Sequence, residues 1–120
     1  MTARQPLVAV LYSVPLLCEA LDSALENIAH VQAFPAHCGD TVGLLRAIRP
    51  DAIVVDDPDE AEYARRWAKR HDVPLVHVAL REQKIRVLRD GGWEERRGTT
   101  AEAIRNALAG ALYGSRDGAS

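Results

Sequence analysis

The segment from Pro50 to Pro58 constrains this chain more than any other. It contains an uninterrupted apolar run, Ala52–Val55, followed at once by Asp56, Asp57 and Pro58. A short strand that is apolar at every position is typical of a parallel sheet covered on both faces, because neither face then meets water. Open α/β proteins place their ligands at the carboxyl ends of such strands. The two aspartates therefore stand where chemistry is expected.

Strands and helices alternate along most of the chain. Apolar runs predict four strands, at 7–11, 31–36, 52–55 and 74–80. Helical spacing of apolar residues predicts three helices between them, at 15–28, 41–48 and 58–71. Asp57 is expected to cap the third of these helices, with Pro58 at its first position. Strands alternating with helices through short loops favour a parallel sheet with helices on both faces.

The pattern changes after residue 80. Lys84–Arg89 alternates like a half-exposed strand, 90–92 has turn chemistry, and Trp93–Arg97 is predicted to return as the second strand of a hairpin. Thr99 or Thr100 is expected to cap a last helix. We expect one domain over residues 1–113, with 114–120 as a flexible tail or linker.

Composition limits the classes of function. With 120 residues, 48% of them hydrophobic and 27% charged, the chain has the composition of a single globular domain. A net charge of −2 gives no concentration of positive charge for nucleic acid or a membrane surface. No apolar stretch approaches the roughly 20 residues of a membrane span. Cys18 and Cys38 lack metal-ligand spacing, so free thiols in a reducing cytoplasm are predicted.

The order of these elements, together with the pattern Pro-Asp-x-x-x-x-Asp over residues 50–56, resembles the receiver domain of two-component response regulators. The resemblance covers about residues 7–80 and the last helix. It implies a flavodoxin-like, doubly wound parallel sheet with strand order 2-1-3-4-5, here with a hairpin in place of the fourth helix. It also implies that Asp56 corresponds to the residue that accepts a phosphoryl group from a histidine kinase.

Most of the positions that support phosphorylation in that family are altered in this chain. The acidic pair that holds Mg²⁺ corresponds to Tyr12 and Ser13, and the hydroxyl residue that ends the fourth strand corresponds to Ala79. No lysine matches the one that ends the family's fifth strand, because Lys84 comes too early. Phosphoryl transfer to a carboxylate needs a metal to neutralise the developing charge. The resemblance therefore implies a degenerate receiver, or pseudo-receiver, with no catalytic residues, metal or cofactor.

Three functions follow as hypotheses. In the first, the domain is not an enzyme and acts through phosphorylation-independent contact with a protein partner or a second copy, for example in transcription regulation. In the second, Asp56 still accepts a phosphoryl group, and Asp57 or Asp59 helps to hold Mg²⁺. In the third, the chain is an unrelated α/β enzyme with a deep pocket at the strand ends. For Asp56 and Asp57, helix capping or a remnant of the fold is the structural alternative.

Candidate interaction residues lie toward the C-terminal end. Trp93 follows two glycines and either packs on the sheet or anchors an interface. The last helix carries apolar residues beside small ones, and the resemblance implies dimerisation through this end of the molecule. The candidates on this helix are Ile104, Leu108, Ala111 and Leu112.

Two further features have an ordinary structural explanation. A basic patch on the third helix, Arg65, Arg66, Lys69 and Arg70, follows Glu62, so an ion-paired solvated face is expected, with a docking site for an acidic partner as the alternative. His77 lies within a strand and is expected to be a hydrogen-bonded histidine of the core or of a surface groove.

Overall fold

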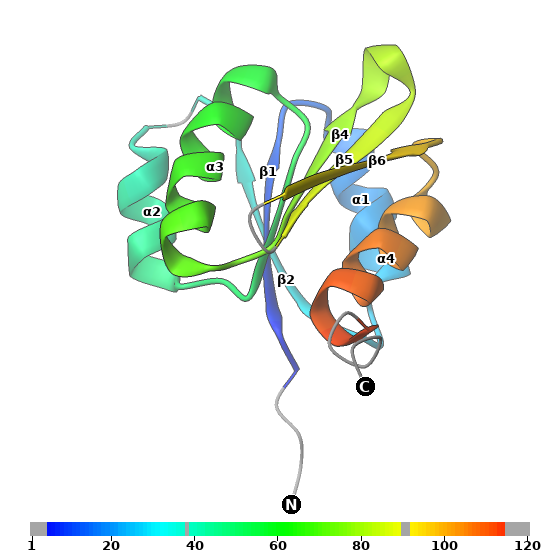
Figure 1. The fold of residues 1–120 in the computed structure, drawn as a ribbon, viewed down its shortest axis with the longest axis horizontal. Helices are drawn as coiled ribbons and strands as arrows, with labels where there is room; N and C mark the ends of the chain where they lie inside the picture. Colours follow the sequence, from blue (N-terminus) through cyan, green and yellow to red (C-terminus); the bar gives the residue numbers. More distant parts are fainter. Residues whose placement is uncertain (1–4, 38, 90–91, 115–120) are drawn as a thin grey trace, which may run out of the picture.

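The computed structural model of this chain describes residues 5–37, 39–89 and 92–114. The strands in these ranges are β1 (Leu7–Tyr12), β2 (His30–Pro35), β3 (Ala52–Val55), β4 (Leu75–Ala79), β5 (Lys84–Arg89) and β6 (Gly92–Arg97). The helices are α1 (Pro15–Ala24), α2 (Thr41–Ile48), α3 (Pro58–His71) and α4 (Ala101–Ala109), with a 3₁₀ turn η1 (Leu80–Glu82) and a π-helical turn η2 (Gly110–Gly114). Figure 1 shows their arrangement.

All six strands form one mixed sheet in the order β2-β1-β3-β4-β5-β6 (Figure 1). Strands β1 to β4 are parallel, whereas β5 is antiparallel to β4 and β6 is antiparallel to β5. The prediction of an α/β protein is confirmed, and the prediction of a wholly parallel sheet is wrong. The chain reverses after β4 through η1, which is too short for the crossover that a parallel neighbour needs. The predicted hairpin at 84–97 is present and continues the sheet.

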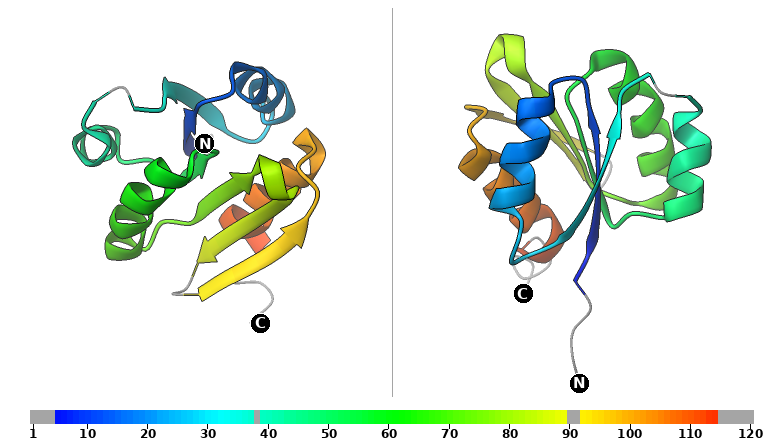
Figure 2. Two further views of the ribbon diagram at one scale, coloured as in Figure 1. Left: turned by 90° about the horizontal axis from the view of Figure 1, so that it is seen from above. Right: turned by 180° about the vertical axis from the view of Figure 1, so that it is seen from behind.

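Helices cover the two faces of the sheet unequally. Figure 2 shows α1 and α4 on one side of it and α2 and α3 on the other. Successive residues of β3 alternate between the two cores, Val54 toward α1 and α4 and Val55 toward α2 and α3. This alternation explains why the whole run Ala52–Val55 is buried. On the α3 side, helix cover ends before the hairpin, where β6 is exposed at nearly every position.

Two of the predicted interface residues belong to the core. Ile104 and Leu108 have no exposed surface and pack on the α1 side of the sheet. A partner cannot contact them in this fold, so both are removed from the predicted interface. The apolar stripe of α4 is used to cover the sheet, which is the ordinary role of such a stripe. Ala111 and Leu112, at the end of the stripe, are only partly buried against the same cluster.

Several local predictions are confirmed, and some fall on residues that the structure does not describe. Asp57 caps α3 and Thr100 caps α4 through the Ala103 N–H, whereas α1 ends at Ala24, before the predicted residue 28. Cys18 is a free thiol. Cys38, the turn residues 90 and 91 and the predicted tail from 115 to 120 lie outside the described residues. No helix within the described ranges has the length and apolar character needed to cross a membrane.

Candidate functional site

Both carboxylate oxygens of Asp56 accept hydrogen bonds at the end of β3. Its Oδ1 accepts from the backbone N–H of Ser13 at 2.7 Å and from the Ser13 hydroxyl at 3.0 Å. Its Oδ2 accepts from the backbone N–H of Val14 at 3.1 Å. The residue is only 8% exposed. Both oxygens are thus held by the loop that joins β1 to α1.

These bonds make Asp56 the cap of a helix on a different segment. Val14 is the N-cap residue of α1. Its apolar side chain cannot accept hydrogen bonds from the free N–H groups at this end of the helix. A carboxylate is well suited to that place, because it accepts N–H bonds and complements the helix dipole. The adjacent strands β1 and β3 bring Asp56 to this loop. Helix capping was the structural alternative for Asp56. In this structure Asp56 bonds to the start of α1, which precedes it in the chain.

Asp57 has the capping role that the sequence predicted. Its Oδ1 accepts from the N–H groups of Asp59 and Glu60 at 2.9 and 3.1 Å, and its Oδ2 lies 2.9 Å from Nε2 of His37. Burial alone would raise the pKa of Asp57, but the hydrogen bonds from His37 and the two backbone N–H groups hold this pKa below its usual value. The same bond raises the pKa of His37.

A second buried carboxylate, Glu60, was missed by sequence reasoning. It is 2% exposed, and it accepts from the His37 N–H at 2.8 Å and from the Thr41 hydroxyl. Glu60 therefore ties the loop between β2 and α2 to the start of α3. A signal did exist, because Glu60 shares its helix face with Ala64 and Trp67, which are both buried. An acid on an apolar stripe predicts a bonded, buried carboxylate.

The magnesium site of the receiver family does not fit the residues present. The groups directed at Asp56 are N–H and O–H donors, which a metal ion would have to displace. Tyr12 is half-buried against the α1 side of the core, and neither Tyr12 nor Ser13 is a carboxylate. Ala79 pairs with Lys84 in the ladder and supplies no hydroxyl. Among the described residues, Tyr12, Ser13 and Ala79 therefore supply no carboxylate to hold Mg²⁺ beside Asp56.

The predicted auxiliary acids gather in a different cluster. Asp57 and Asp59 lie with His37 so that one ligand atom from each falls within 4.8 Å of the others. Both oxygens of Asp57 are already hydrogen-bonded, and His37 and Asp59 are exposed. This cluster explains the capping of α3 and the anchoring of the neighbouring loop. It does not include Asp56.

Beside α3, the hairpin forms a hollow of about 450 Å³. Trp93 is 47% exposed at its rim, so it neither packs fully on the sheet nor stands free of it. His77 is 9% exposed, and its Nε2 has no hydrogen-bond partner among the described residues, so the prediction of a hydrogen-bonded histidine is wrong for that atom. Burial, with the charge of Arg86, lowers the pKa of His77. The remaining lining residues are Pro58, Ala61, Glu62, Arg65 and Glu95.

The basic patch on α3 is in part ion-paired, as expected. Arg65 binds Glu62 at 2.5 Å, and Nε of Arg66 lies 3.8 Å from the same carboxylate. Lys69 and Arg70 lie in the last turn of α3, where positive charge complements the helix dipole. The patch therefore has a sufficient structural explanation.

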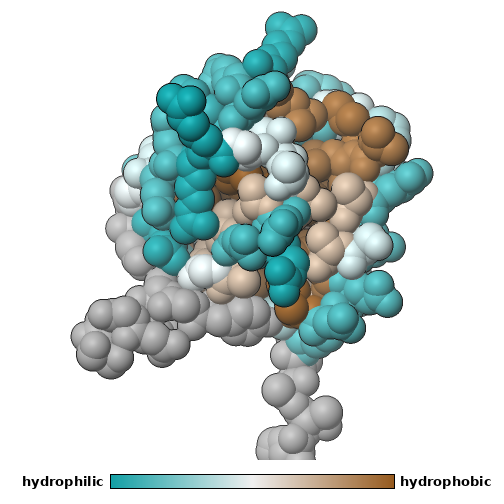
Figure 3. Space-filling view, turned by 90° about the vertical axis from the view of Figure 1, so that its right-hand side faces the viewer, coloured by the Kyte–Doolittle hydropathy of each residue, from teal (hydrophilic) through white to brown (hydrophobic). Residues whose placement is uncertain are grey.

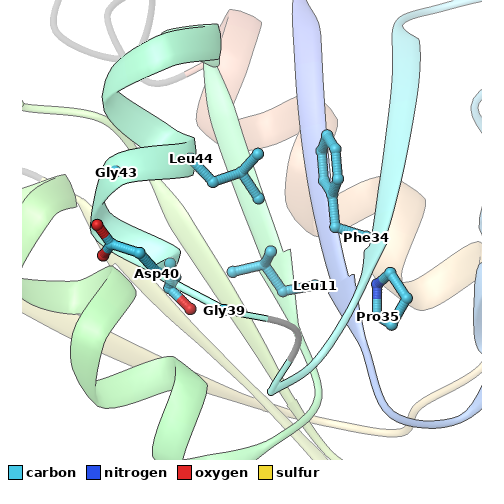
Figure 4. A pocket seen from close by; sticks show the side chains of 8 residues that line it. Leu11, Phe34, Pro35, Gly39, Asp40, Gly43 and Leu44 are labelled. Atoms are coloured by element: carbon cyan, nitrogen blue, oxygen red, sulfur yellow. The ribbon is translucent and has the colours of Figure 1, made fainter.

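A second hollow, of about 430 Å³, opens between β2 and α2. Figure 4 shows the side chains of Leu11 and Leu44 directed into this space, with Phe34 beside them and the Asp40 carboxylate turned away. Its lining is therefore mostly apolar at the center. The enzyme hypothesis places its pocket at the strand ends, beside Tyr12, Asp56 and Ala79. Neither this hollow nor the one beside α3 is lined by any of these three residues.

Comparisons with known proteins assign no family. No family model, no curated protein and no solved structure matches this chain. A function must therefore be inferred from the geometry described above.

Proposed function

We propose that this chain is a non-enzymatic pseudo-receiver with a flavodoxin-like core, which acts in cytoplasmic signalling through protein–protein contact and without phosphorylation. The bonding of Asp56 carries this proposal. A phosphoacceptor carboxylate needs one oxygen free to attack the phosphoryl group and another free to bind Mg²⁺. In this chain both oxygens are hydrogen-bonded to the start of α1.

Phosphorylation at Asp56 would remove existing stabilisation. A phosphoryl group on either oxygen would break the present bonds from Ser13 or Val14, and the N–H groups at the start of α1 would need a new acceptor in the same geometry. An unsatisfied, partly buried N–H costs about 1–3 kcal/mol. No hydroxyl at Ala79 and no carboxylate at Tyr12 or Ser13 would offset this cost.

The exposed apolar residues favour a role in binding. Trp93 is half-exposed on the hairpin, and Val14 and Leu16 are exposed at the start of α1, where Leu16 reaches 72%. Figure 3 shows the side of the molecule with α1, α4 and the hairpin, where hydrophobic side chains gather in patches among hydrophilic ones. Aromatic residues in such positions often anchor protein interfaces. The partner is therefore a protein, either another chain or a second copy, and not a nucleic acid or a membrane.

The experiment that tests this proposal adds Mg²⁺ and beryllofluoride, which mimics a phosphoryl group on a carboxylate. We expect the thermal unfolding midpoint and the tryptophan fluorescence to stay unchanged at millimolar Mg²⁺. A saturable, Mg²⁺-dependent shift that disappears in Asp56→Asn would contradict the proposal and support the phosphoacceptor hypothesis. Glu62→Gln is the matched control, because it removes an exposed carboxylate on α3 that neither hypothesis assigns to Mg²⁺.

A further inference from the structure

Among the residues that the structure describes, no strand pairs with the backbone groups on the outer side of β6. Gly98 donates its N–H to the Gln83 carbonyl at 2.9 Å, which fixes that pair as hydrogen-bonded. Hydrogen-bonded pairs recur at every second residue of an antiparallel ladder. The backbone groups of Gly92, Glu94 and Arg96 therefore face β5. Those of Trp93, Glu95 and Arg97 face outward, where no strand of the described chain lies beyond β6.

This edge has only part of the usual protection against pairing with another strand. Natural edge strands are commonly blocked by charged side chains, proline, a bulge or a covering segment, and β6 carries four charged residues, Glu94–Arg97. The other edge of the sheet, β2, ends in Pro35. In contrast, β6 has no proline, and its register with β5 runs without a bulge from Arg97 to Gly92. Figure 2 shows β6 at the margin of the sheet.

The side chains of β6 are complementary to a second, antiparallel copy of the same strand. Two acids, Glu94 and Glu95, precede two bases, Arg96 and Arg97. With a two-fold axis at Glu95, Glu94 faces Arg96 of the second copy, and this pair occurs twice. Trp93 then faces Arg97 of the second copy, which suits a cation–π contact. Charges of one sign along the edge would instead have repelled a second copy.

The same axis also satisfies the backbone. Glu95, Trp93 and Arg97 are the residues whose N–H and C=O groups face outward. With the axis at Glu95, Glu95 opposes Glu95 and Trp93 opposes Arg97 as hydrogen-bonded pairs, and Glu94 opposes Arg96 as the non-hydrogen-bonded pair between them. An axis at Glu94 or Arg96 would also let the outward-facing groups pair, but it sets Glu94 or Arg96 against its own copy and loses both Glu94–Arg96 pairs. An axis at Arg97 would bring two arginines together.

In this pairing Glu95 lies opposite Glu95 of the second copy, and two like charges there are unfavourable. Each Glu95 is already paired with Arg86 at 3.2 Å and with Lys84 at 3.8 Å in its own chain. These two bases balance the charge that each copy brings to the axis. Like charges directly opposite cost a few tenths of a kcal/mol in a sheet, and this neutralisation reduces that cost.

We propose that two copies of this chain pair edge to edge through β6, antiparallel and with the two-fold axis at Glu95, to form one sheet continuous across both copies. This rests on the proposed function, since it names a second copy as a protein that the domain binds. The two hollows are weaker candidates, because nothing in the structure indicates what would fill them.

The mass in solution, measured by light scattering over a range of concentrations, tests the pairing. The wild-type chain is expected at twice its own mass of 13.2 kDa at high concentration. Glu94→Arg and Arg96→Glu should each weaken the dimer by about tenfold or more, because every copy then opposes like charges twice. Combining both substitutions restores opposite charges across the axis and should restore the dimer.

A second variant tests the backbone. Glu95→Pro removes an N–H that faces outward and breaks no bond to β5, so it should give a folded monomer with an unchanged circular dichroism spectrum. Glu26→Arg, an exposed charge reversal after α1, is the matched control and should stay dimeric.

Three results would overturn the pairing: a monomeric wild type at the highest soluble concentration, a dimer that persists in Glu95→Pro, or a folded double variant that stays monomeric. None of them bears on the phosphoryl-mimic test, so the proposed function could stand with a different partner. Conversely, a beryllofluoride response would remove the pseudo-receiver function and leave the β6 dimer in place.

Discussion

The carboxyl ends of the parallel strands and the β5–β6 hairpin differ in how their polar groups are satisfied. At the strand ends, Asp56, Asp57 and Glu60 accept hydrogen bonds from three loops and helix starts. At the hairpin, the outer backbone groups of β6 point away from β5, and beside it Nε2 of His77, in β4, has no partner in the described chain. Capacity for new bonds therefore lies at the hairpin, away from the residues that look chemically active.

The difference follows from how each region is covered. Parallel strands joined by helices are buried on both faces, so a carboxylate at their ends must find donors within the fold. The hairpin needs no crossover helix, and α4 covers only one of its faces. Among the described residues, no strand pairs with its outer edge.

The largest contrast is expected between a core residue of α4 and the exposed tryptophan of the hairpin. Leu108→Ala should lower the free energy of unfolding by about 3 kcal/mol, because it leaves a cavity in a fully buried site. Trp93→Ala should lower it by less than about 1 kcal/mol in the monomer, because only part of that side chain is packed. Urea unfolding at low protein concentration measures both. Equal losses would show that the hairpin is part of the core.

The next effect concerns the cap that Asp56 provides. Asp56→Ala should cost about 2 kcal/mol of unfolding free energy, because N–H groups of Ser13 and Val14 lose their acceptor. Asp56→Asn keeps one acceptor oxygen and should cost less. Chemical denaturation of the two variants beside Asp59→Ala, an exposed control, measures the series. A cost at Asp56 no larger than that at Asp59 would argue against the structural role.

A smaller loss is expected at Glu60. Glu60→Gln should reduce the free energy of unfolding by about 1 kcal/mol, because the charge-assisted bonds are lost. The single amide oxygen can accept from the His37 N–H, and the Thr41 hydroxyl must then accept from the new NH₂ group. Glu62→Gln, an exposed residue on the same helix, is the matched control. Thermal unfolding of both variants under one buffer gives the comparison. A neutral Glu60→Gln would show that the loop between β2 and α2 does not depend on this carboxylate.

The smallest effects are opposite in sign for the two perturbed histidines. Because the pKa of folded His37 is raised above 6.5, its contribution is fully present below that pH and is lost as pH rises through the folded pKa. Because the pKa of folded His77 is lowered below 6.5, the unfolded chain binds a proton that the folded chain does not, and stability falls as pH drops below 6.5.

Stability measured between about pH 5 and pH 8 for His37→Gln and His77→Gln separates these contributions. At the acidic end, His37→Gln should lose the most unfolding free energy relative to wild type. At the same pH, the unfolding free energy of His77→Gln should be most favourable relative to wild type, because the wild type is then destabilised by its unprotonated His77. Parallel curves for the two variants would mean that neither histidine titrates as its surroundings imply.

The features that the sequence could predict are those determined by residues adjacent in the chain. The run Ala52–Val55 and the cap at Asp57 were predictable, since adjacent residues determine both. The direction of β5 was not predictable from adjacent residues. It is antiparallel to β4 because a four-residue turn joins the two strands, where a parallel neighbour would need a longer crossover. The roles of Asp56 and Glu60 depend on loops brought beside them by neighbouring strands, and no spacing within their own segments records those contacts.

Amide hydrogen exchange, resolved by residue at low and high protein concentration, tests the central claim most directly. We predict that the N–H groups of Ser13 and Val14 are protected at both concentrations, because Asp56 holds them. Those of Trp93, Glu95 and Arg97 should become protected only at high concentration, when β6 pairs with a second copy. Unprotected Ser13 and Val14, together with a Glu95 exchange rate that does not depend on concentration, would contradict the account.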